Sequence, residues 1–303
     1  MKSHVLALLA LAAWLPLASL AGEIATSFPA KTRVVIRVDA DKLRTLPVFQ
    51  QFLTNKVGDQ QEFFQTIKTW SGIDLDSVKE VWVGVLKKDH AVIVLKGDFD
   101  LDTIRTAVMQ IDTAQVAMRP QVPFSVMLAD DKRPGEFNLA ALLDDSTVAI
   151  GRPELVDEYI SSYVTDDFAM SEDRAAIAKD LAGSPWGVDV ALFEMGPEEL
   201  AKNPWMKLIS WVRFRGEMKE DLALQLILAP TEEKAALATK NLLDSARTLY
   251  LMVPKESQKL KGIKEFLLKN VQTRVVEGLL LADVTMPGDA GAKLLGGILR
   301  KMK

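Results

Sequence analysis

Hydrophobic and polar positions follow one another along the first half of the chain in a pattern that predicts paired strands followed by a helix. Residues 33–39 (RVVIRVD) are rich in β-branched side chains and predict a strand. Residues 79–86 and 90–96 predict two more strands, and the polar turn between them predicts a hairpin. Asp100 or Asp102 is then placed to cap a helix that ends near residue 111.

The remaining part of this half predicts a second group of strands and a closing helix. Apolar runs at residues 123–129 and 137–143 flank a turn cluster, and residues 146–151 form another short strand. Pro153 is placed where the first position of a helix favours proline. We therefore expect a helix over residues 154–163. Between the first strand and the hairpin, we expect helices over residues 42–55 and 60–70.

The same order of elements returns after a polar, acidic stretch near residues 165–174. Strands are predicted at residues 187–193, 213–218 and 222–228, the last two as a hairpin. Thr231 is a candidate cap for a long helix to residue 251. Further elements are expected beyond it: a helix over 255–269, strands over 271–277 and 279–285, and a last helix from near Pro287 to residue 300.

Short sequence matches support an internal repeat between the two halves. Leu43 and Pro47 in the first half correspond to Leu200 and Pro204 in the second, just after the first strand. Residues 87–92 correspond to residues 219–224 around each hairpin turn, and the order in each half is close to β-α-β-β-α-β-β-α. The sequence therefore predicts an α+β fold with two tandem related halves. Each is a mainly antiparallel sheet with helices packed on one face, in a split βαβ-like order.

The first residues have the pattern of a secretory signal. Lys2 precedes an apolar run from Val5 to Leu17, and Ser19 and Ala21 place small side chains before a cleavage site. The alternative is an uncleaved anchor. No later stretch is long and apolar enough to span a membrane. We expect a signal peptide over 1–21, a first repeat over 22–164, a linker with a short helix over 165–184 and a second repeat over 185–303. The protein would be exported, to the periplasm or the extracellular space.

Composition narrows the chemistry that the mature chain can perform. The chain has 303 residues, no cysteine and two histidines, so thiol nucleophiles, disulfides and cysteine-based zinc sites are excluded. Removal of the signal leaves His90 as the remaining histidine and takes the formal net charge from −4 to −5. A net negative charge argues against general nucleic-acid binding, which depends on neutralising phosphates. No nucleic-acid partner is therefore expected.

Candidate catalytic and metal-binding residues each have a structural explanation. His90 opens a strand after a charged turn, and we expect a half-exposed strand-edge histidine there rather than a general base. Asp98, Asp100 and Asp102 look like the start of a calcium loop, but Thr103 and Met109 occupy the positions that need glycine and glutamate. No nucleophile elbow, phosphate loop or dinucleotide fingerprint occurs in the sequence. We therefore predict no catalytic residue, no cofactor and no metal.

Two groups of side chains are candidates for binding a partner or ligand. Trp186, Trp205 and Trp211 lie close together in sequence and predict either an aromatic binding cluster or packing between the halves. The second group is a set of lysines along a predicted amphipathic helix, which could contact anionic lipid or an acidic partner, or could be the outer face of a surface helix. These lysines are Lys255, Lys259, Lys261 and Lys264.

The stretches from Pro29 to Pro47, from Trp70 to Gly84 and from Lys96 to Asp100 resemble uncharacterised exported bacterial proteins with tandem α+β halves. The resemblance implies the fold and the compartment, and it brings no established reaction, cofactor or site residue. We therefore expect a non-catalytic exported protein that binds a partner protein, a peptide or an envelope component. The alternatives are a carboxylate-based hydrolase and a carrier of an apolar ligand.

Overall fold

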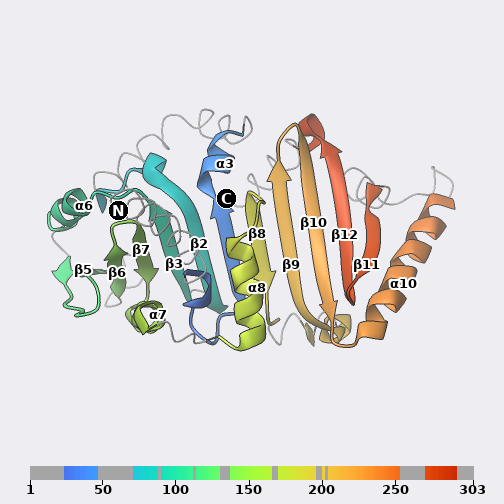
Figure 1. Cartoon of the computed structure of the whole chain (residues 1–303), viewed down its shortest axis with the longest axis horizontal. Helices are drawn as coiled ribbons and strands as arrows, with labels where there is room; N and C mark the ends of the chain where they lie inside the picture. Colours follow the sequence, from blue (N-terminus) through green and yellow to red (C-terminus); the bar gives the residue numbers. More distant parts are fainter. Residues whose placement is uncertain are drawn as a thin grey trace, which may run out of the picture. The chain divides into compact units, whose positions relative to one another are not determined.

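A computed structural model describes most of the chain, which divides by its contacts into two compact units (Figure 1). The first unit comprises Met1–Asp41 and Gly58–Pro185, and the second comprises Lys42–Val57 and Trp186–Lys303. The described residues are 24–46, 71–87, 90–111, 114–129, 137–165, 170–195, 200–201, 204–252 and 270–291.

The described part of the first unit contains an antiparallel sheet, as the strand patterns predicted. Its strands lie in the order β1 (Val34–Asp39), β2 (Val78–Lys87), β3 (His90–Gly97), β7 (Thr147–Gly151), β6 (Phe137–Asp144), β5 (Phe124–Ala129) and β4 (Gln115–Val116) (Figure 1). The hairpin of β2 and β3 is confirmed, with Trp82 opposite Val94. The sequence did not predict β4, because a strand of two residues is too short to show a periodic pattern.

Helices cover both faces of this sheet. On one face, α7 (Pro153–Thr165) packs on β3, β6 and β7, and α8 (Glu172–Ala182) packs on β1. On the other face, α6 (Leu101–Val108) shares an apolar cluster with Val148 of β7. Val148 and Gly151 point to opposite faces because they are an odd number of residues apart, and a side chain at Gly151 would meet Val156 of α7. The predicted helix layer on one face therefore holds for α7 and α8 but not for α6.

Residues 24–28 form part of the core of the first unit. Ile24 and Phe28 are fully buried, and the Tyr159 hydroxyl on α7 donates a hydrogen bond of 3.3 Å to the Ile24 carbonyl. The Phe28 and Tyr159 rings lie 5.3 Å apart between centroids. Trp82 of β2 is also fully buried and belongs to the core of the first unit.

The second unit contains a smaller antiparallel sheet among its described residues. Its strands lie in the order β8 (Val188–Leu192), β9 (Ile209–Met218), β10 (Asp221–Pro230), β12 (Leu279–Pro287) and β11 (Gln272–Val276) (Figure 1). The long helix α10 (Glu233–Met252) packs against β10, β11 and β12. Short elements complete the described chain: α3 (Ala40–Arg44), and the 3-10 helices η1 (Leu75–Ser77) and η2 (Pro204–Leu208).

The two sheets repeat one topology and one register. The order β1-β2-β3-β7-β6 in the first unit matches β8-β9-β10-β12-β11 in the second. Val85 pairs with Ala91, and Glu217 pairs with Ala223, each 132 residues later. Ala140 pairs with Ile150, and the positions 132 and 133 residues later, Gln272 and Asp283, pair in the same way. A shared register across successive strand pairs confirms the predicted internal repeat.

Several local predictions need correction. Thr231 does not cap α10, because the helix begins at Glu233 and the Thr231 hydroxyl donates to the Leu208 carbonyl at 3.3 Å. Pro287 is the last residue of β12 and residues 288–291 are helical, so the expected start of the last helix near Pro287 is confirmed. The helix expected to begin at residue 42 begins two residues earlier, as α3 at Ala40.

The predicted linker belongs to the first unit, and several predicted helices lie outside the described residues. Residues 165–184, expected as a linker with a short helix, contribute α8 to the first unit, where Ala178 and Leu181 are fully buried. The helices expected over 60–70 and 255–269, most of the helix over 42–55 and most of the last helix lie outside the described residues.

Candidate functional site

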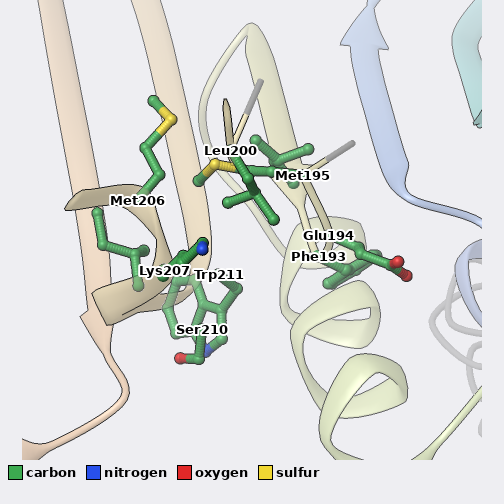
Figure 2. A pocket seen from close by; sticks show the side chains of 10 residues that line it. Phe193, Glu194, Met195, Leu200, Met206, Lys207, Ser210 and Trp211 are labelled. Atoms are coloured by element: carbon green, nitrogen blue, oxygen red, sulfur yellow. The ribbon is translucent and has the colours of Figure 1, made fainter. Parts of the chain in front are cut away.

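The second unit has a pocket where β8 ends and β9 begins (Figure 2). Its volume is about 310 Å³, near the lower end of the range for small-molecule sites. The end of β8, the residues after it, η2 and the start of β9 supply its walls. The lining residues are Leu192, Phe193, Glu194, Met195, Leu200, Met206, Lys207, Ile209, Ser210 and Trp211.

A β-bulge shapes the β9 side of the pocket. Trp211 pairs with Ala229, but the next pairing is Ile209 with Pro230, so Ser210 is an extra residue on β9. The Ser210 hydroxyl donates to the Ala229 carbonyl at 2.8 Å and holds this irregular end of the strand in place. Bulges bend a strand locally and redirect its side chains. The bulge therefore separates Ile209 from the regular register of β9, which begins at Trp211.

The walls of the pocket are mainly apolar and include flexible side chains. Phe193 is buried, with 6% of its surface exposed, and Trp211 is half-buried. Met195 and Met206 are half-buried as well. Methionine is unbranched and polarisable, so it adapts to apolar groups of different shape. The lining therefore suits apolar groups of several shapes rather than one group of a fixed shape.

Two charged side chains belong to the pocket, and they are oriented differently. The Lys207 amine lies among the lining side chains, whereas the Glu194 carboxylate points away from them (Figure 2). Within the described part of the chain, no carboxylate lies within hydrogen-bonding or ion-pairing distance of Lys207. The pocket therefore presents one positive charge beside an apolar surface.

The structure separates the tryptophans that the sequence placed together. Trp211 lines the pocket, but Trp186 lies beyond the opposite end of β8, where Val188 pairs with Gly216. The five residues of β8 span roughly 13 Å at the usual rise of a strand. Trp186 and Trp211 therefore do not form one cluster.

The other candidate binding residues lie partly or wholly outside the described residues. Trp205 is in η2, next to the lining residue Met206, and its side chain is outside what the structure describes. The proposed basic surface, Lys255, Lys259, Lys261 and Lys264, falls wholly within residues 253–269, which are not described.

A row of paired charges lies on the same face of β9 as Trp211, and the sequence analysis did not identify it. Arg213 donates two hydrogen bonds to Asp189, of 2.8 and 2.7 Å, and the two side chains are 3% and 0% exposed. Arg215 donates to Gln225 at 3.4 Å, and Gln225 donates to Asp283 at 2.7 Å. The signal was the alternation of charged and apolar residues along β9, which places Trp211, Arg213 and Arg215 on one face.

The residues considered for catalysis or metal binding occupy the start of a strand, a helix cap and an exposed ion pair. His90 is half-buried at the start of β3, opposite Lys87. Asp100 is the N-cap of α6, and Asp98 forms an exposed ion pair of 2.7 Å with Lys79. Among the described residues, no group of three histidine or acidic side chains is arranged to hold a metal ion, and no helix is long and apolar enough to cross a bilayer.

Hydrogen bonds lower the pKa of Asp100 below its usual value of about 3.8. The largest contribution comes from the Thr103 hydroxyl, which donates to the Asp100 carboxylate at 2.7 Å, and the Thr103 and Asp102 amides also donate to it. The acidic cluster therefore works as a helix cap at this point of the fold.

Comparison with known proteins finds similarity of structure alone. No family model and no curated protein sequence matches the chain. Solved structures of the protein TP0453 have a similar fold. Crystal form IV has a TM-score of 0.53 at 7% identity and covers 89% of this chain and 95% of TP0453. Crystal form III has a TM-score of 0.50 at 7% identity, with 90% and 97% covered. The two proteins therefore share a mixed α and β fold over nearly their whole lengths.

Proposed function

We propose that the protein is a non-catalytic, exported binding protein that holds an apolar group of a partner in the pocket of its second unit. The partner would be a protein, a peptide or a component of the cell envelope. The observation that supports this function is the pocket itself, with Phe193, Met195, Met206 and Trp211 around a volume of about 310 Å³. A pocket of this size suits one large side chain or a small ligand.

The surface beside the pocket fits the same role. Leu208 follows Lys207 in η2, and 59% of its surface is exposed. An exposed leucine next to an apolar pocket provides contact area outside the pocket for a larger partner, whose anchoring side chain would enter the pocket. The backbone amide of Thr231 donates to the Leu208 carbonyl at 2.8 Å, so the end of η2 is held against the start of the next element.

A panel of short peptides tests this function. Each peptide has one leucine, phenylalanine, tryptophan or methionine in a polar context, and NMR of the full chain reports which backbone amides shift. We expect shifts in residues 192–195 and 206–211 with at least one peptide. Met206→Glu should abolish them, because a charged carboxylate inside the pocket would lose its hydration.

Leu237→Glu is the matched control, since Leu237 on α10 is 56% exposed and outside the pocket lining. It should leave peptide binding unchanged. Absence of any shift in the pocket residues of the unmodified protein, across the whole panel, would reject the proposed function.

The same apolar lining also favours the second candidate, a carrier of an apolar ligand. Mass spectrometry of the protein under native conditions would show a co-purifying small molecule in that case, and Met206→Glu would remove it. The hydrolase alternative gains nothing from this pocket. Glycoside hydrolysis needs two carboxyl groups facing one bond, whereas Glu194 is the one acidic residue of the lining and points away (Figure 2).

A further inference from the structure

We infer that the group bound in this pocket carries a carboxylate beside its apolar part, and that Lys207 binds this carboxylate. The inference rests on the proposed function, because it specifies the ligand of the same pocket. Lys207 follows Met206 in η2, and its amine lies among the mainly apolar side chains that line the pocket (Figure 2). It therefore adds a charge to a site that otherwise recognises shape and apolarity.

The position of Lys207 favours a ligand anion over a partner within the protein. Its side chain is exposed, its amine lies among the lining side chains, and no carboxylate of the described residues pairs with it (Figure 2). Glu194 points away and does not offset the charge on the pocket side. A ligand anion at the rim would form a charge-assisted hydrogen bond while its apolar part fills the pocket.

The type of anion follows from the number of donors. Phosphate groups are usually held by several donors at once, such as arginine forks or successive backbone amides. Here the lining offers one ammonium group and no arginine, and the Ser210 hydroxyl already donates to Ala229. A single ammonium matches a single negative charge, so a carboxylate fits better than a phosphate.

Two sources could supply this chemistry, namely a free small apolar acid or the C-terminal residue of a peptide with an apolar side chain. The volume of about 310 Å³ accommodates either of them. The test therefore uses two matched pairs of probes. One pair is 4-methylpentanoate and 4-methylpentanamide, and the other is a Gly-Ser-Gly-Leu peptide with a free or an amidated C-terminus.

Calorimetric titration of the full chain with each probe measures the contribution of the carboxylate. We expect at least one acid to bind roughly five-fold more tightly than its amide, as suits an exposed ion pair. The difference should shrink as salt is added. It should disappear in Lys207→Gln and persist in Lys207→Arg. Lys31→Gln removes the same charge from an exposed lysine of the first unit and should change nothing.

Each outcome has a distinct meaning. A preference for the free peptide acid supports the inference with a chain terminus as the source, and a preference for 4-methylpentanoate supports it with a small acid as the source. Equal binding of acid and amide overturns the inference and leaves the proposed function intact. A preference for the acid that survives Lys207→Gln also overturns it. Absence of binding by all four probes, together with an unresponsive peptide panel, rejects the inference and the proposed function together.

Discussion

At the scale of single residues, Asp100 shows how one carboxylate begins a helix. It accepts hydrogen bonds from the amides of Asp102 and Thr103 and from the Thr103 hydroxyl. These bonds stabilise the charged form and lower the pKa of Asp100 below about 3.8. Because the folded-state pKa is lower than the unfolded one, the stabilisation is present above pH 3.8. It is lost as the pH falls through the folded-state pKa.

Asp100→Ala should therefore lower the free energy of unfolding at pH 7, and the difference from the unmodified protein should narrow at pH 2.5. Urea unfolding at the two pH values measures both effects. Asp102→Ala is the control, because the Asp102 side chain is exposed in the first turn and forms a long ion pair of 3.7 Å with Arg105. Equal destabilisation by the two variants would show that general negative charge, rather than the cap, accounts for the effect.

The buried ion pair between Asp189 and Arg213 makes the second unit sensitive to the loss of a single charge. Asp189 is fully buried, and Arg213 and Arg215 both lie within 3.4 Å of its carboxylate. Replacing one member leaves a buried charge without compensation. Asp189→Leu should therefore destabilise the second unit by about 3–5 kcal/mol.

The double variant Asp189→Leu/Arg213→Met should recover much of this loss, because it removes the two most deeply buried charges, while the more exposed Arg215 keeps its hydrogen bond to Gln225. Urea unfolding compares the single and double variants. Asp98→Ala breaks the exposed pair with Lys79 and should cost about 1 kcal/mol or less. If the double variant is no more stable than Asp189→Leu, the uncompensated charge of Arg213 is not the cause of the destabilisation.

At the scale of elements, the strands and hairpins could be predicted from the sequence, while the pocket could not. Residues such as 79–86 and 90–96 combine β-branched runs with a polar turn, which is a local signal. The pocket depends on the bulge at Ser210 and on the approach of η2 to the end of β8, which are properties of the folded register. The alternative of one tryptophan cluster does not hold for Trp186 and Trp211, since residues near in sequence can lie at opposite ends of paired strands.

The packing of residues 24–28 on β2 depends on a glycine. The ring of Phe28 packs directly against the backbone at Gly84. A side chain at this position would collide with the ring. Gly84→Ala should therefore destabilise the first unit by about 1–3 kcal/mol through overpacking. Gly183→Ala is the matched control, because nothing lies within 4 Å of the added atom. Thermal unfolding compares the two variants, and equal melting temperatures would contradict this account of the contact.

At the scale of the whole molecule, the two units keep one register but differ in chemistry at equivalent positions. One row of directly paired residues crosses β1, β2, β3 and β7, and the equivalent row crosses β8, β9, β10 and β12. The first row is apolar and the second is polar, so the two units share the order and register of their strands but differ in the side chains of this row. The first row is Ile36, Val83, Ile93 and Ile150. The second is Asp189, Arg215, Gln225 and Asp283.

This divergence places the proposed binding role in the second unit. Trp211 pairs with Ala229, and the residue 132 positions before Ala229 is Gly97, which pairs with the buried Val78 because a bulge in β2 leaves Lys79 unpaired in the ladder. The aromatic wall of the pocket therefore has no counterpart at that position of the first unit. The repeat accounts for the shared order of strands, while the proposed function depends on side chains that are present in the second unit.

The expected signal peptide ends just before the folded core, so the fold limits how far along the chain the signal can be cleaved. Cleavage after Ala21 would leave Gly22 and Glu23 ahead of Ile24, which is fully buried and bonded to Tyr159. We expect the protein recovered outside the cytoplasm to begin at Gly22, as measured by intact mass. Ala21→Leu should block cleavage, because the position requires a small side chain.

The core contact explains why cleavage much further along the chain would be costly. A chain that begins at Lys31 loses Ile24 and Phe28 from the core, and removal of one buried phenylalanine side chain alone costs about 3–5 kcal/mol. A full-length species retained at the membrane would favour the uncleaved anchor instead. A full-length species in the cytoplasm would contradict export altogether. Unfolding of the chains that begin at Gly22 and at Lys31 then measures directly how much residues 24–28 stabilise the first unit.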